Sequence, residues 1–217
     1  MIFKNIIFDL GVVVLNIDYN GPAKVLKHMG VENFDEYYSK AKQNSLFDNF
    51  EKGFISPDEF RKSLKENLGL KLSNSKIDSI WNAMILDFPK KRIELLIALK
   101  KHYKTYLLSN TNKIHYSCYT RQLKHDGLSW KDLFHKTFYS FKMGLRKPDH
   151  LIYKQALNDA QITASESLFI DDLLINIEAA KACGLKTIWL KEGMEITDIF
   201  EKDAKTGTLK PNFDLIC

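Results

Sequence analysis

The chain has few cysteines for its length, and none of them belongs to a familiar motif. Its 217 residues include three, Cys118, Cys183 and Cys217, with no C-x-x-C pair. An odd number without paired spacing argues against a disulfide framework and is typical of reduced thiols inside a cell. Apolar runs of membrane-spanning length and a leader segment ahead of the first strand are also missing. We therefore expect a cytoplasmic protein with no membrane partner.

Blocks of charge of one sign are equally scarce. The formal net charge is +5 at pH 7, and it comes from lysines spread along the chain, as in Lys90-Lys91-Arg92 and Lys100-Lys101. No basic stripe interleaved with aromatic residues occurs, so we expect no nucleic acid partner. A modest positive surface attracts anionic small molecules. Hydrophobic residues at 45% and charged residues at 27% are ordinary values for a globular protein that buries a core.

Histidine offers no zinc signature. The histidines have no spacing typical of a zinc site, and the default interpretation places each of them at the surface or in a satisfied hydrogen bond. They are His28, His102, His115, His125, His135 and His150. The chemistry is therefore sought among the carboxylates.

Helical patterns fill the region from about residue 16 to residue 87. Ser56-Pro57-Asp58-Glu59 is a helix start, with a Ser N-cap, a Pro in the first turn and a Glu that completes a capping box. This helix is predicted to end at Gly69. The apolar spacing over 34–41 predicts an earlier helix, and another begins near Ser73. No convincing buried strand occurs here, so the region is predicted to be an inserted helical subdomain.

Strand and helix patterns alternate in the rest of the chain. A short buried strand precedes Asp9, and four more strands are predicted over 105–108, 137–140, 167–170 and 187–190, the last of these being the final strand. Right-handed crossovers between such strands produce a parallel sheet with helices on both faces. The expected fold is α/β, with residues 1–15 and 88–217 as its core and residues 16–87 inserted after the first strand.

Polar residues follow the predicted strands. Asp9 follows the first strand, Ser109 the second and Asp171-Asp172 the fourth, and Lys147 lies shortly after the third. Because the carboxyl ends of parallel strands share one edge of a sheet, these residues are expected to meet there. Taken singly, each has a plainer interpretation as a helix cap or a turn residue. Taken together, carboxylates, a hydroxyl beside an amide and a lysine favour phosphoryl transfer.

The expected chemistry follows from the residue types. Clustered carboxylates need a cation to offset their repulsion, and hard oxygen ligands suit Mg²⁺. Asp9 can attack phosphorus to form an aspartyl-phosphate, which water then hydrolyses. Ser109 and the backbone N–H groups after it can donate to phosphate oxygens, while Lys147 neutralises phosphate and holds Asp9 ionised. We predict a small phosphorylated molecule as the substrate.

Four motifs resemble those of the haloacid dehalogenase-like (HAD) hydrolase superfamily. They are Asp9-Leu10-Gly11-Val12-Val13, Ser109-Asn110, Lys147-Pro148, and Asp171-Asp172 with Asn176. The chain is more closely similar to the bacterial alpha-D-glucose 1-phosphate phosphatase group, through Phe8-Asp9-Leu10-Gly11, Leu108-Ser109-Asn110-Thr111-Asn112, Gly144-Leu145-Arg146-Lys147-Pro148 and Phe169-Ile170-Asp171-Asp172. The resemblance implies a Rossmann-like three-layer core, a small helical cap made by the inserted block, and a phosphatase for a sugar phosphate such as glucose 1-phosphate.

The resemblance also implies a role for each matched residue. Asp9 is the implied nucleophile, and Lys147 is the implied catalytic charge stabiliser. Ser109 and Asn110, together with Lys147, are the implied substrate-binding residues. These roles agree with the chemistry expected from the residue types.

The implied magnesium ligands are Asp9, Asp172 and the backbone carbonyl of Gly11, and Asp171 is either a further ligand or a partner of the ligands. Position 11 is also the main departure from the superfamily, because most of its phosphatases carry there a second Asp that acts as general acid and base. Such a group typically contributes a hundredfold or more. Three explanations stay open: a cap residue or water replaces it, the leaving group is easily expelled, or turnover is poor.

Several alternatives stay open at this point. Rival functions are phosphoryl transfer of the beta-phosphoglucomutase type, metal-independent 2-haloacid dehalogenation, and a non-catalytic sensor of phosphorylated metabolites. Phe47, Asp48 and Glu51 in the helical block either face the substrate or occupy ordinary helix-face positions. The protein is expected to be a monomer or a homodimer.

Overall fold

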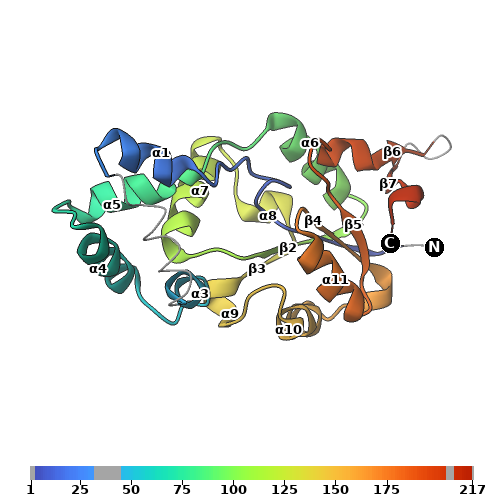
Figure 1. Ribbon diagram of the computed structural model, residues 1–217. Helices are drawn as coiled ribbons and strands as arrows, with labels where there is room; N and C mark the ends of the chain where they lie inside the picture. The colour runs from blue at the N-terminus through green and yellow to red at the C-terminus, as the bar shows by residue number, and fades with distance from the viewer. Residues whose placement is uncertain (1–2, 32–44, 204–207, 217) are drawn as a thin grey trace.

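The computed structural model describes residues 3–31, 45–203 and 208–216 (Figure 1). Its main sheet is built from the strands β1 (Asn5–Phe8), β2 (Lys104–Ser109), β3 (Lys136–Tyr139), β4 (Ser167–Asp171) and β5 (Lys186–Trp189). All neighbouring strands are parallel, and the order across the sheet is β3-β2-β1-β4-β5. This sheet confirms the predicted α/β class.

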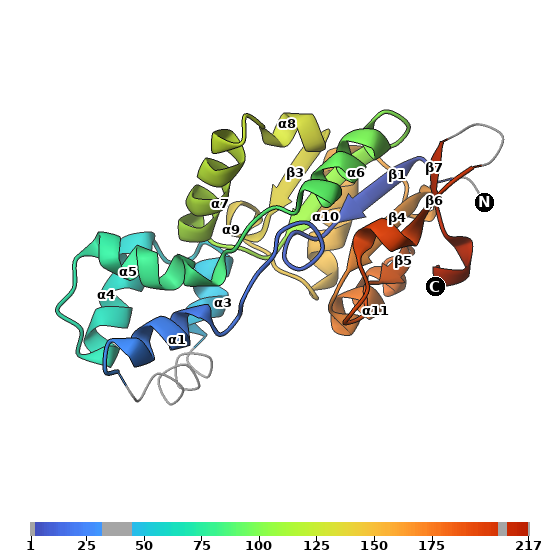
Figure 2. The same cartoon turned by 90° about the horizontal axis from the view of Figure 1, so that it is seen from above.

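Helices cover both faces of the sheet and complete a three-layer core (Figure 2). Alternate strand residues serve the two faces, since Ile6 and Phe8 pack on one side and Ile7 on the other. Burial on both faces explains why these strands are continuous apolar runs in the sequence. The helices on the first face are α6 (Lys90–Lys100), α7 (Lys113–His125) and α8 (Trp130–Leu133), and those on the second are α10 (His150–Ala160) and α11 (Leu174–Ala182).

The parallel register brings the ends of three strands to one edge of the sheet. Phe8 of the central strand β1 pairs with Leu107 of β2 and with Ile170 of β4. The chain therefore reaches Asp9 and Asp171 side by side at the carboxyl edge. Ligands bind at this edge in open α/β sheets.

Residues 16–31 and 45–87 form a group of helices beside the sheet, which we name the helical lobe (Figure 2). The predicted start of one of these helices is confirmed: the Ser56 hydroxyl accepts from the Glu59 N–H, and the Glu59 carboxylate accepts from the Ser56 N–H. Gly69 ends the same helix with φ +62°. The helix predicted over 34–41 lies outside the described residues. The elements of the lobe are α1 (Gly21–His28), α3 (Leu46–Glu51), α4 (Pro57–Leu68), α5 (Asn74–Trp81) and the short η1 (Asn82–Met84).

Two segments that run side by side connect the helical lobe to the sheet. The Asn16 N–H donates to the Asp87 carbonyl, and the Leu86 N–H donates to the Asn16 carbonyl. The lobe has an apolar core of its own, and Ile114 from the start of α7 packs into that core. The lobe therefore rests on the first turn of α7.

Two sequence predictions about strands are wrong. Residues 187–190 do not contain the final strand, because β6 (Phe200–Lys202) and β7 (Leu209–Pro211) follow them as an antiparallel pair. Three-residue strands are too short to show a recognisable alternation. Ser140 does not end the third strand but begins α9 (Ser140–Met143), and its hydroxyl accepts from the Thr111 N–H and donates to the Thr111 carbonyl. The remaining short helices are η2 (Ala164–Glu166), η3 (Ile196–Ile199) and η4 (Phe213–Leu215).

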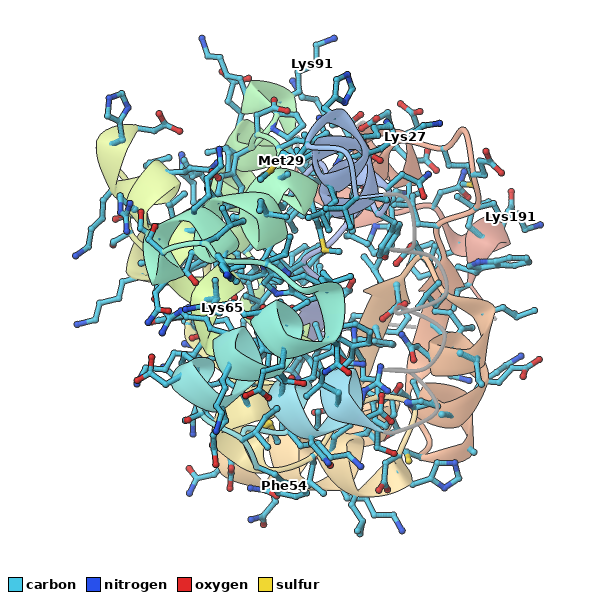
Figure 3. All side chains as sticks on the ribbon, turned by 60° about the vertical axis from the view of Figure 1, so that its left-hand side comes forward. Lys27, Met29, Phe54, Lys65, Lys91 and Lys191 are labelled. Carbon is cyan, nitrogen blue, oxygen red and sulfur yellow. The ribbon has the colours of Figure 1, made fainter. Side chains whose placement is uncertain are left out.

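The surface lysines are dispersed. In Figure 3, Lys27, Lys65, Lys91 and Lys191 lie at separate places around the molecule and come from different parts of the chain. This arrangement agrees with charge scattered along the sequence. Within the described parts of the chain, every helix is too short or too polar to cross a membrane.

Candidate active site

A cleft of about 280 Å³ lies between the carboxyl edge of the sheet and the helical lobe. The lobe contributes Phe47, Glu51 and Trp81 to its wall. Six of the predicted site residues line it, namely Asp9, Gly11, Ser109, Asn110, Lys147 and Asp172. Asp171 is fully buried and contacts Lys147 directly. The structure thus brings all the predicted site residues to one place.

Lys147 lies between two carboxylates. Its Nζ is 2.5 Å from Asp9 Oδ1 and 2.6 Å from Asp171 Oδ2, and its side chain is only 1% exposed. The loop that carries it is held by Asn110, whose amide donates to the Lys147 carbonyl and whose amide oxygen accepts from the Lys147 N–H. The Asn110 side chain therefore positions the lysine.

The two neighbouring acidic residues after β4 have different surroundings. Asp171 accepts hydrogen bonds from Lys147, from the Asn176 amide and from the Leu173 N–H, so both of its oxygens are occupied. Among the described residues, no side chain donates a hydrogen bond to the Asp172 carboxylate, and Asp172 lines the cleft. The Asp172 oxygens are therefore the more accessible ones for a ligand.

The site holds more negative than positive charge. Burial raises the pKa of Asp9, and Asp171 raises it further, while Lys147 pulls it down. Burial also raises the pKa of Asp172 to about 6, with a further contribution from Asp171. Burial works against the charge on Lys147, but Asp171 and Asp9 outweigh it and raise the lysine pKa. One lysine does not balance three carboxylates.

The donor set fits a small divalent cation. Carboxylate oxygens of Asp9, Asp171 and Asp172 lie within 4.8 Å of one another. A hard cation prefers such oxygens, and its charge would stabilise the ionised forms of Asp9 and Asp172, whose pKa values burial raises. Asp9 and Asp172 could therefore hold Mg²⁺, with the occupied Asp171 carboxylate beside them.

The backbone turns sharply at Gly11, on the wall of the same cleft. The Gly11 carbonyl accepts from the Val13 N–H over 2.6 Å, and Val12 between them has φ 62°. A carbonyl oxygen has two lone pairs, so one remains for another partner. The buried Arg92 donates to the Val12 carbonyl and pairs with Glu195, which holds the turn in place.

Arg146 has a role at the cleft that the sequence analysis overlooked. It forms an ion pair with Asp48, and its Nε lies 3.0 Å from Glu51 Oε2. Both acidic residues belong to α3, so Arg146 connects the helical lobe to the loop of Lys147. Of the two interpretations left open for the helical block, the cleft-facing one applies to Phe47 and Glu51. The available signal was the position of Arg146 beside the motif lysine.

The default interpretation of the histidines holds for only one nitrogen of His115, because Nδ1 lies 2.9 Å from the Asn82 side-chain oxygen. This residue is 5% exposed, lines the cleft, and has no hydrogen-bond partner for Nε2 in the described ranges. The available signal was its place in the first turn of the helix that follows the Ser109 motif. Its spacing from other potential ligands could not have revealed it.

Comparisons with known proteins give a consistent result. The family model for haloacid dehalogenase-like hydrolases matches residues 72–184. D-ribitol-5-phosphate phosphatase from Bacteroides thetaiotaomicron is 30% identical over 194 residues, which are 88% of this chain and 94% of that protein. Sesquiterpene phosphatase astK from Aspergillus oryzae is 29% identical over 88% of this chain and 92% of its own length.

A solved structure agrees with these sequence relatives. The HAD family enzyme bt-2542 from Bacteroides thetaiotaomicron, crystallised with magnesium and inorganic phosphate, superposes with a TM-score of 0.86 at 34% identity. The match covers 92% of this chain and all of that one. The chain is therefore a hydrolase of the haloacid dehalogenase-like family, which confirms the family predicted from its four motifs.

Proposed function

We propose that this hydrolase is a Mg²⁺-dependent phosphatase that acts on a small phosphorylated sugar or sugar alcohol. The observation that carries the proposal is the buried contact between Lys147 and Asp9, in a cleft that Ser109 and Asp172 also line. The lysine favours the ionised form of Asp9, which is the form that attacks phosphorus. A cleft of about 280 Å³ suits a small metabolite.

In the first step, an Asp9 oxygen attacks phosphorus, and the bond between phosphorus and the leaving alcohol oxygen breaks. In the second step, water attacks the phosphorus of the aspartyl-phosphate, and the bond to Asp9 breaks to release inorganic phosphate. The Ser109 hydroxyl and the Asn110 N–H donate to phosphate oxygens, and Lys147 stabilises the negative charge that develops on them. The Asn110 side chain keeps Lys147 in place.

We assign the magnesium ligands to Asp9, Asp172 and the Gly11 carbonyl. Asp171 lies beside these ligands and does not bind the ion, because its oxygens already accept hydrogen bonds from Lys147, Asn176 and a backbone N–H. Bound Mg²⁺ supplies positive charge that offsets the charge of the phosphate. The complex of bt-2542 with magnesium and inorganic phosphate supports this choice of ion.

Residues 16–87, to which the helical lobe belongs, serve as a cap over a core made of residues 1–15 and 88–217. The similarity to D-ribitol-5-phosphate phosphatase supports a phosphorylated sugar alcohol, and glucose 1-phosphate stays a prediction. Because Gly11 carries no acid, the leaving-group proton comes from water or from the cap. Glu51 lines the cleft from the cap side, and burial raises the pKa of its carboxyl, although Arg146 acts in the opposite direction.

The test is phosphate release from a panel that includes D-ribitol 5-phosphate and glucose 1-phosphate, with and without Mg²⁺. Wild type is compared with Asp9→Asn and with Asp159→Asn, which changes an exposed residue that is not part of the cleft wall. We expect release that needs both Mg²⁺ and Asp9 and that Asp159→Asn does not affect.

The rival functions give different results in the same experiment. An isomerised sugar phosphate without free phosphate would indicate a mutase, and chloride released from 2-chloropropionate without metal would indicate a dehalogenase. Binding of sugar phosphates without turnover would indicate a sensor. Near-normal phosphate release by Asp9→Asn would contradict the proposed nucleophile.

A further inference from the structure

Two residues that line the cleft, Trp81 from the helical lobe and His115 from the core, carry buried ring nitrogens. Trp81 ends α5 and is 7% exposed, and His115 lies in the first turn of α7 and is 5% exposed. Their rings stack with centroids 5.2 Å apart and planes 8° apart. Within the described part of the chain, neither Trp81 Nε1 nor His115 Nε2 has a hydrogen-bond partner.

The protonation state of His115 follows from its other nitrogen. His115 Nδ1 lies 2.9 Å from the side-chain oxygen of Asn82, and an amide oxygen can only accept. Nδ1 therefore carries the hydrogen, and Nε2 presents a lone pair. Burial lowers the pKa of His115 to about 3, so the ring stays neutral near pH 7. A group with that pKa is a poor proton donor or base at neutral pH, which leaves hydrogen-bond acceptance as its role.

The two nitrogens therefore form a matched set. Trp81 Nε1–H can only donate, and His115 Nε2 in this tautomer can only accept, so the two rings cannot satisfy each other in a stack. A buried polar atom without a partner costs free energy, which a ligand that supplies the partner recovers. A hydroxyl group both donates and accepts, so hydroxyls are the chemical group that matches both nitrogens.

We propose that Trp81 and His115 form a hydroxyl-binding subsite for the part of the substrate that leaves, with His115 Nε2 accepting from a hydroxyl and Trp81 Nε1–H donating to one. The proposal rests on the proposed phosphatase function and narrows its substrate to phosphates of polyhydroxylated molecules. The subsite spans the lobe and the core, so a bound hydroxyl also connects the cap to the catalytic core.

Packing around the rings supports polar rather than aromatic recognition. Trp81 also stacks with Phe47, at 5.4 Å between centroids and 7° between planes, and packs against Phe60 at 4.9 Å. The face of the indole is thus used for packing within the protein. The contact left to a ligand is with the ring edge, which includes the N–H.

The test is a binding measurement that does not depend on turnover. Calorimetry on full-length Asp9→Asn with Mg²⁺ compares a pentitol phosphate with n-pentyl phosphate, which has the same carbon chain without hydroxyls. We expect the pentitol phosphate to bind at least tenfold more tightly. His115→Phe and Trp81→Phe, each added to Asp9→Asn, keep an aromatic ring and remove the nitrogen, and each should reduce this preference by roughly tenfold.

Matched controls separate the subsite from general damage. His125→Phe changes an exposed histidine at the end of the same helix, and Trp130→Phe changes a tryptophan whose Nε1 already donates to Thr120. Both should leave the preference unchanged. Equal binding of the two phosphates to Asp9→Asn, or an equal loss for both in the ring variants, would overturn the subsite. Failure of the wild type to release phosphate would instead count against the proposed function, because the binding comparison does not need turnover.

Discussion

Replacement of Lys147 by methionine tests how strongly this lysine offsets the repulsion between the carboxylates of the site. Lys147 Nζ lies 2.5 Å from Asp9 and 2.6 Å from Asp171, and its side chain is 1% exposed. Methionine keeps an apolar stem of similar length and removes the charge. Removal of one partner from a buried ion pair typically costs about 3–5 kcal/mol, because it leaves the other charge unpaired. We expect Lys147→Met to lose free energy of unfolding in that range.

Coulomb's law gives an energy of similar size for the repulsion between two carboxylates of the site. Carboxylate oxygens of Asp9, Asp171 and Asp172 lie within 4.8 Å of one another. At that separation and an effective dielectric constant of about 20, two unit charges repel by roughly 3.5 kcal/mol. Lys147 lowers the pKa of Asp9 and of Asp172, so its loss should raise both, and the penalty should shrink as the pH falls and these two groups bind protons. Mg²⁺ replaces part of the lost charge, so it should stabilise Lys147→Met more than wild type.

The assay is urea unfolding followed by circular dichroism, in metal-free buffer and with added Mg²⁺. Lys181→Met is the matched control, since Lys181 is exposed in the last turn of α11. Its effect should stay within about 0.5 kcal/mol. Equal unfolding midpoints for wild type and Lys147→Met in metal-free buffer would refute the reasoning, and so would an equal gain from Mg²⁺ in both proteins.

Three further predictions concern pH, the missing acid and the contact between lobe and core. Burial lowers the pKa of His115 from 6.5 to about 3, so only the unfolded chain binds a proton there as the pH falls below 6.5. Between pH 6.5 and 5, wild type should lose about 2 kcal/mol of unfolding free energy relative to His115→Phe in urea titrations, and parallel pH profiles would contradict this. In both Gly11→Asp and Gly11→Asn the added Cβ lies 2.9 Å from Ile17, so the two variants differ only in the acid. We expect Gly11→Asp to release phosphate from alkyl phosphates at least tenfold faster than Gly11→Asn, and this ratio measures the missing acid. Equal rates would show that an acid at this position adds nothing. Gly53 and Gly69 have similar φ, +72° and +62°, but only a Cβ at Gly53 meets a backbone oxygen, that of Phe141 in the core, at 2.2 Å. Gly53→Ala should therefore unfold at a lower urea concentration than Gly69→Ala. Equal unfolding midpoints would contradict the close contact.

Several features of the protein were readable directly from the sequence. The capping box at Ser56 and the end of α4 at Gly69 depend on neighbours within a few residues, and the structure confirms both. The parallel sheet was predictable because strands buried on both faces are continuous apolar runs, and short crossovers leave few topologies. The convergence of Asp9, Lys147 and Asp171 followed from that topology. Their chemical roles and the boundaries of the cap stay predictions.

Other features were decided only when distant segments packed. β6 and β7 are too short to carry a pattern, and the sequence alone did not predict them. The contact of Arg146 with α3 joins residues about a hundred positions apart, which no local pattern reports. His115 resembles the other histidines in the sequence, and its neutral, cleft-lining state exists because Asn82 and Trp81 surround it in the folded protein.

The sequence by itself determined the class of fold, the order along the chain of the five strands of the main sheet, and the residues that gather at the sheet edge. Periodicity, caps and turns act over short distances and are therefore visible in a linear chain. The tertiary structure alone decided which polar atoms found partners, and that the Asp171 oxygens are occupied while those of Asp172 are accessible. It also decided that two ring nitrogens of cleft residues are buried with no partner in the described part of the chain. Hydrogen-bond partners and burial depend on elements far apart in the sequence, so they appear only after the sheet, the loops and the helical lobe have packed together.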